Sequence, residues 1–110
     1  MAKIERTVRG DFQTIVNTLH SAVMAGSASA SLEEECDLGG AGYSGILRVY
    51  ERYSWFGSNR VSMALAVVGA NGEYKVSAVT SGGSRAMFFK VNTVGEDAFL
   101  DTVADAIARL

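Results

Sequence analysis

The stretch from Gly45 to Asn92 constrains the fold most, because it holds most of the aromatic and β-branched residues in short runs separated by turn residues. The turns are Gly57-Ser58-Asn59, Asn71-Gly72 and Gly82-Gly83, and Asn-Gly is the strongest short hairpin signal. Four consecutive antiparallel strands joined by three short turns are therefore predicted.

The three turns also predict a register for each hairpin. They pair Trp55 with Val61, Val67 with Val76, and Ala78 with Met87. A slip of one residue would move the apolar residues of a strand to the other face. In this register the large apolar residues share one face, and the predicted core face consists of Leu47, Val49, Tyr53, Trp55, Val61, Met63, Leu65, Val67, Tyr74, Val76, Met87, Phe89 and Val91.

A helix is predicted before this sheet, over residues 12–25. Asp11 is a suitable N-cap, and Gly26 suits a left-handed residue after the helix. The apolar stripe of this helix consists of Phe12, Ile15, Val16, Leu19 and Val23. The segment Lys3–Arg9 is expected to form a short edge strand.

A second helix is predicted at the carboxyl end, beginning at Thr93. Thr93 and Glu96 have the spacing of a capping box. The apolar stripe that would cover the sheet consists of Phe99, Val103, Ala106, Ile107 and Leu110.

An acidic run follows the first helix. Ser27 to Leu32 alternates small residues as a strand would, and Glu33, Glu34, Glu35 and Asp37 come directly after it. These carboxylates could hold a metal ion, but in an extended chain they point alternately to opposite faces. A solvated edge strand is the favoured interpretation, and no metal site is predicted.

These elements give a single α+β domain over residues 1–110. We expect an antiparallel meander of about five to six strands with two helices packed on one face, in the order β-α-β-β-β-β-β-α. A reduced helix-grip fold is the alternative.

Composition excludes several classes of function. A net charge of −2 provides no general attraction to nucleic acid or to an anionic membrane. The amino end has no apolar run typical of a signal peptide, and no segment is long enough to span a bilayer. The single cysteine, Cys36, is consistent with a cytoplasmic protein. Cys36 and His20 are too few ligands for zinc, and no cofactor motif is present.

Several segments of the chain carry a resemblance to known proteins: Gly10-Asp11-Phe12, Arg48 to Ser54, Asn59 to Ser62, Thr80 to Ser84, and Phe88 to Thr93 with Gly95-Glu96. Together they resemble a family of small uncharacterised bacterial proteins, found mostly in Gram-positive anaerobes. The similarity covers essentially the full chain. The resemblance implies a domain of unknown function and provides no catalytic residues to carry over.

Two features on or beside the predicted sheet are candidates for chemistry. Glu51 is the one charged residue predicted in the middle of the core face, where its carboxyl group could act as an acid or base with His20 as partner. A local bulge that turns Glu51 outward, or a structural ion pair with an arginine, is the favoured alternative. The second feature is the segment Ser81, Gly82, Gly83, Ser84 and Arg85, whose amides, hydroxyls and guanidinium could bind an anion. A plain two-glycine turn is the favoured interpretation.

The opposite face of the sheet is the preferred binding surface, and a merely solvated face, with Arg and Lys stems lying over small residues, is the alternative. It is predicted to have a floor of small apolar residues, Ala64, Ala66, Val79 and Ala86, with Lys75 beside it. Aromatic and basic residues are predicted around this floor, and the binding set consists of Arg48, Tyr50, Arg52, Ala64, Ala66, Phe88 and Lys90.

Two classes of function follow from these candidates. A non-catalytic binding or assembly module would form a homodimer through the open sheet face, or dock an acidic partner or small ligand there. A small-molecule carrier or enzyme would have a cavity between helices and sheet containing Glu51. The bulky predicted core favours the first class.

Overall fold

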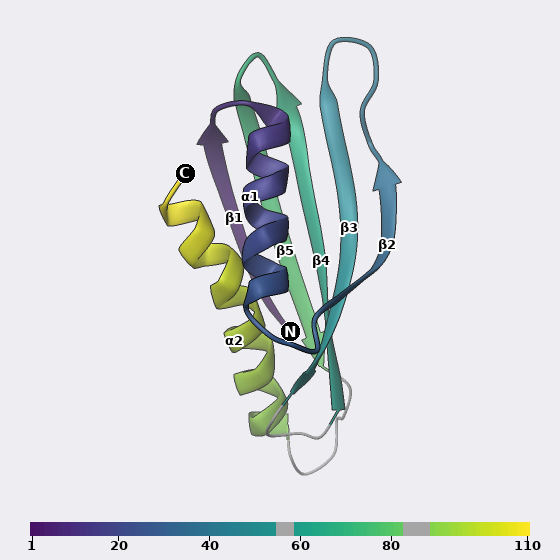
Figure 1. Cartoon of the computed structure of the whole chain (residues 1–110), viewed down its shortest axis with the longest axis vertical. Helices are drawn as coiled ribbons and strands as arrows, with labels where there is room; N and C mark the ends of the chain where they lie inside the picture. The colour runs from purple at the N-terminus through teal and green to yellow at the C-terminus, as the bar shows by residue number, and fades with distance from the viewer. Residues whose placement is uncertain (55–58, 83–88) are drawn as a thin grey trace.

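The computed structural model describes residues 1–54, 59–82 and 89–110 and shows a two-layer α+β fold (Figure 1). The elements are β1 (Ala2–Arg9), α1 (Phe12–Ala25), β2 (Ser31–Asp37), β3 (Ser44–Ser54), β4 (Asn59–Ala70), β5 (Glu73–Gly82) and α2 (Phe89–Ala108). The sheet order is β1-β5-β4-β3-β2, and all neighbouring strands are antiparallel. Both helices lie on one face of the sheet, as predicted.

Helix α1 has the predicted bounds because its ends are set locally. The carboxylate of Asp11 accepts a hydrogen bond from the backbone N–H of Thr14, which satisfies one of the free donors of the first turn. The prediction that Gly26 has a left-handed backbone is wrong, because Gly26 ends the helix with a φ of −72°. An added Cβ at Gly26 would lie 2.8 Å from the side chain of Thr102, so close helix packing explains this glycine better than backbone conformation.

The β4–β5 hairpin has the predicted register. Asn71 and Gly72 both have positive φ, 56° and 79°, which is the backbone of a tight two-residue turn. Val67 pairs with Val76, and the same alignment continues to Met63 opposite Thr80.

The predicted register of the β3–β4 hairpin is wrong by three residues. Tyr53 pairs with Arg60 and Tyr50 pairs with Met63, so every side chain of β3 points to the face opposite to the predicted one. Leu47, Val49 and Tyr53 therefore lie on the face away from the helices. Trp55 is outside the described residues.

The carboxyl end also differs from the prediction, because α2 begins at Phe89. The predicted last strand of the meander is absent over 89–92, and Thr93 and Glu96 lie inside the helix rather than at its cap. Met87 is outside the described residues. The predicted stripe is confirmed where it meets the sheet, since Phe99, Val103 and Ala106 are fully buried.

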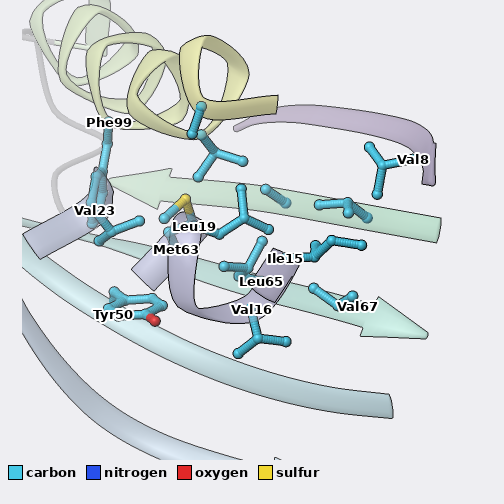
Figure 2. Packing of buried hydrophobic residues seen from close by; sticks show 14 of the residues in the cluster. Val8, Ile15, Val16, Leu19, Val23, Tyr50, Met63, Leu65, Val67 and Phe99 are labelled. Carbon is cyan, nitrogen blue, oxygen red and sulfur yellow. The ribbon is translucent and has the colours of Figure 1, made fainter. Parts of the chain in front are cut away.

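The core lies between the helices and the central strands (Figure 2). Ile15, Leu19 and Val23 of α1 pack over Met63, Leu65 and Val67 of β4. Among the described residues, Tyr50 and Phe99 are the largest fully buried side chains, and Tyr50 lies at the margin of the core toward β3. Burying these apolar groups is the main stabilising contribution to the fold.

The two edges of the sheet are polar, as predicted. Within the described residues, β1 pairs with β5 alone and β2 pairs with β3 alone, and β2 has exposed acidic side chains. Ser27 to Ala30 form a turn rather than the predicted start of a strand. In the described part of the chain, neither helix is long and apolar enough to cross a membrane.

Candidate functional site

The face of the sheet that points away from both helices carries a continuous apolar patch. We call this patch the apolar floor; it consists of Leu47, Val49, Ala64, Ala66, Val68 and Val79. These residues alternate along their strands with the buried core residues, so they all point to the open side. Neighbours in the floor pair directly across strands, for example Leu47 with Ala66 and Ala64 with Val79.

The floor is shallow in the middle of the sheet because β4 contributes small residues there. Ala64 and Ala66 are partly exposed, whereas Met63 and Leu65 beside them are buried against the helices. Small side chains let another backbone or sheet approach closely, while Val79 remains 36% exposed. This arrangement suits packing against a second flat surface better than enclosing a small molecule.

Charged side chains surround the apolar floor. At the β2–β3 corner, Arg60 donates from Nε to Oε1 of Glu51 at 2.7 Å and lies 3.7 Å from a carboxylate oxygen of Glu33. At the β1 edge, Lys3 and Lys75 both approach Glu5, at 3.7 and 3.4 Å. The charged residues around the apolar floor therefore carry a net negative charge on the β2 side of the sheet and a net positive charge on the β1 side.

The structure brings only part of the predicted binding set to this face. Ala64 and Ala66 lie on it, as predicted, with Val79 and Lys75. The predicted positions of Arg48, Tyr50 and Arg52 are wrong, because the shifted register turns them toward the helices. Phe88, like Ala86, lies outside the described residues, and Lys90 belongs to α2.

Glu51 lies on the open face rather than on the core face. It is bound by Arg60, and the hydroxyl of Ser62 donates to its other oxygen at 3.4 Å. No bulge is needed to turn it outward, since β3 pairs regularly with β4 throughout. Glu51 and His20 are therefore on opposite sides of the sheet and do not form the predicted acid–base pair.

Sequence reasoning missed Leu47 and Val49 as members of the apolar floor. The signal that could have placed them was Glu51 itself, because a charged residue in the middle of a core face indicates a wrong register. A register in which Glu51 points to the open face also places Leu47 and Val49 on that face.

On the helix side, β3 contributes a chain of polar groups at the margin of the core. The hydroxyl of the fully buried Tyr50 lies 2.8 Å from Nδ1 of His20 on α1. Arg48 lies beside Tyr50 and donates from Nε to Glu35 at 2.6 Å. Burial raises the pKa of Tyr50 above its ordinary value, and the neighbouring Arg48 offsets part of that rise.

Arg48 and Arg52 have opposite pKa shifts on the same strand face. Burial lowers the pKa of Arg48, but the hydrogen bond to Glu35 and the nearby Tyr50 outweigh it, and the net shift is upward. Arg52 has its guanidinium carbon 4.6 Å from the ring centre of Phe99, and burial lowers its pKa. On this face, Arg48 therefore pairs with an acidic side chain and Arg52 with an aromatic ring.

The anion-binding candidate lies only partly within the described residues. Ser81 and Gly82 end β5, and Gly83, Ser84 and Arg85 lie outside the described residues. Among the residues that are described, no three metal-binding side chains come together. Cys36 is an exposed free thiol on the edge strand β2.

Comparison with known proteins identifies the family of this chain but indicates no activity. No functionally curated protein matches the chain. The model of a family of unknown function, DUF6054, matches residues 1–110, which confirms the expectation of a domain of unknown function that spans the full chain. The chain therefore belongs to the DUF6054 family.

Proposed function

We propose that this protein is a non-catalytic assembly module that forms a homodimer by packing the open sheet faces of two copies. The observation that carries the proposal is one row of residues across all five strands: Lys3, Val79, Ala64, Val49 and Glu34, each paired with the next. This row is basic at one end, acidic at the other and apolar between.

Such a row is complementary to itself. A two-fold axis along β4, lying between two stacked sheets, places β1 of one copy over β2 of the other. Lys3 then faces Glu34 of the second copy at both ends, and the apolar residues meet in the middle. An axis perpendicular to the strands would instead place Lys3 against its own equivalent, which like-charge repulsion disfavours.

The available area is sufficient for a specific dimer. Five strands about 4.8 Å apart, with about eight residues each at about 3.3 Å per residue, form a face of roughly 600 Å². A face-to-face pair would bury roughly 1,200 Å² in total, which is at the lower limit for stable protein–protein interfaces. Apolar contact in the centre and charge pairs at the rim match the usual anatomy of such interfaces.

Sedimentation equilibrium tests the proposal directly. The wild-type protein should be dimeric at micromolar concentrations, and Ala66→Arg should make it monomeric because two extra charges would meet at the centre of the interface. Asn17→Arg is the matched control, since Asn17 is exposed on α1 and the same charge is added away from the open face. A monomeric wild type, or a dimeric Ala66→Arg variant, would show that this face is not the interface.

A charge exchange tests the proposed orientation. Lys3→Glu and Glu34→Lys should each weaken dimerisation several-fold, because each creates a like-charge pair at both ends of the row. The double variant restores opposite charges and should return the affinity to near the wild-type value. If the double variant is as weak as the single ones, the axis along β4 is wrong.

We also propose a cytoplasmic location for this dimer. Cys36 is an exposed free thiol on the edge strand β2, so an oxidising compartment would favour disulfide cross-links between neighbouring molecules. Non-reducing electrophoresis of protein taken directly from cells should show no cross-linked dimer, and abundant cross-linking would contradict this location.

A further inference from the structure

A trough lies on the helix side of the sheet, on the opposite side from the open face. It is formed by two adjoining hollows of about 300 and 370 Å³ that share Phe12, Asp37 and Gly45. Ile46 lines the first hollow and Tyr43 lines the second. Helix α1 starts at the same end of the molecule as the β2–β3 connection, which explains why Phe12 forms one wall (Figure 1).

Gly40 in the β2–β3 connection and Gly45 in β3 allow close packing beside the trough. An added Cβ at Gly45 would lie 3.1–3.2 Å from Leu38, and one at Gly40 would lie 2.7 Å from the Tyr43 ring. The ring therefore rests against the Gly40 backbone, and Gly40 and Tyr43 form a β-bridge. Tyr43 is 49% exposed, so one side of an anchored aromatic ring faces solvent.

The trough has an uncompensated negative charge. Asp37 uses Oδ1 to accept the backbone N–H of Gly39 at 2.8 Å, and it forms no ion pair with any residue that the structure describes. Arg48 is already paired with Glu35, which also lines the trough, so this guanidinium is engaged elsewhere. Helix α1 contains no lysine or arginine, and the carboxylate of Asp11 caps its positive end.

From these features we infer that the trough binds a small organic ammonium ion, with the ammonium group on Asp37 and its apolar part between Phe12 and Tyr43. Aromatic ring faces attract cations electrostatically, and a carboxylate supplies the opposite charge. Volumes of 300–370 Å³ lie in the range of small-molecule sites. A neutral ligand of the same shape would lose the contribution of Asp37, so charge is the basis of selectivity.

Binding can be measured with 2-phenylethylammonium and its neutral counterpart 2-phenylethanol. Amide chemical shifts of Gly40 and Gly45 should move on titration with the ammonium compound, with a Kd on the order of millimolar for so small a ligand. The alcohol should bind at least tenfold more weakly. Equal shifts with both compounds would overturn the inference.

Variants locate the site. Asp37→Asn keeps an oxygen for the Gly39 amide but removes the charge, and it should weaken ammonium binding about tenfold. Tyr43→Ala should also weaken it, whereas Asp101→Asn removes an exposed carboxylate on α2 and should have no effect. Unchanged binding by Asp37→Asn would overturn the inference.

This inference is independent of the proposed dimer, because the trough and the open face lie on opposite sides of the sheet. Ala66→Arg should leave ammonium binding unchanged, even if it dissociates a dimer. Loss of binding in that variant would contradict the assignment of the trough as a separate site.

Discussion

At the scale of single residues, Tyr50 shows how a polar group is accommodated at the margin of a core. Its ring is fully buried among apolar residues, and its hydroxyl reaches His20 on α1 at 2.8 Å. A buried hydroxyl without a partner would destabilise the fold, so this contact lets a tyrosine occupy the position. The contact also links α1 to β3, the strand whose register was not predicted correctly from the sequence.

Replacing Tyr50 with phenylalanine should therefore destabilise the protein. We expect a loss of about 1 kcal/mol in the free energy of unfolding, because the hydrogen bond is removed and His20 loses its partner. Urea denaturation measures this change. Tyr53→Phe is the control, since Tyr53 is 55% exposed, and its variant should retain wild-type stability.

Tyr50 should also affect stability at alkaline pH. Its pKa in the folded state is raised above the ordinary value of 10.0 by burial, so its contribution to stability is fully present below pH 10 and is lost as pH rises through the raised pKa. The free energy of unfolding should therefore fall with increasing pH in this range. The fall should be less steep in Tyr50→Phe, and an identical slope in both proteins would contradict this origin.

At the scale of elements, segments with local signals were predicted and those that depend on long-range packing were not. The bounds of α1 follow from Asp11 and an apolar stripe, and the β4–β5 register follows from Asn71-Gly72; both are confirmed. The loop between β3 and β4 has no comparable signal. Apolar residues occur on both faces of β3, so alternation alone could not choose its core face.

The candidate site was predicted only as far as these registers allowed. Ala64 and Ala66 were placed correctly because β4 was, whereas Tyr50 was placed on the wrong face because β3 was turned over. The start of α2 was missed for a similar reason. Phe89 and Val91 alternate as strand residues would, and this pattern was preferred over the helix that the structure shows.

The β4–β5 turn provides a test at this scale. Asn71 has φ of 56°, a region that β-branched residues rarely occupy. Asn71→Val should destabilise the protein by about 1–2 kcal/mol, whereas Asn71→Gly should be nearly neutral because glycine adopts this backbone without a Cβ clash. Thermal unfolding of both variants measures the difference, and equal stability would show that the turn does not limit this hairpin.

At the scale of the whole molecule, only one face of the sheet is covered in the described structure. Helices α1 and α2 bury the core face, and the opposite face exposes the apolar floor (Figure 1). A monomer of this design would leave that floor in contact with water. The proposed dimer would remove it and give the sheet a second covered face.

If the dimer forms, the thermal stability of the protein should depend on its concentration. A tenfold increase should raise the midpoint of unfolding by about 3 °C for a dimer of this size, because association stabilises only the folded state. Scanning calorimetry at several concentrations measures this shift. In Ala66→Arg the midpoint should not depend on concentration, and a constant midpoint for the wild type would contradict dimerisation.

The position of β1 has a consequence for the order in which the chain folds. Ala2 pairs with Thr80 and Arg9 with Glu73, so the first strand must wait for β5, which lies far along the chain. The β3–β4 and β4–β5 hairpins bring together segments that are close in sequence, and such contacts form faster than contacts between distant segments. During synthesis β5 therefore has a free edge when it emerges, and β1 is the strand that closes it last.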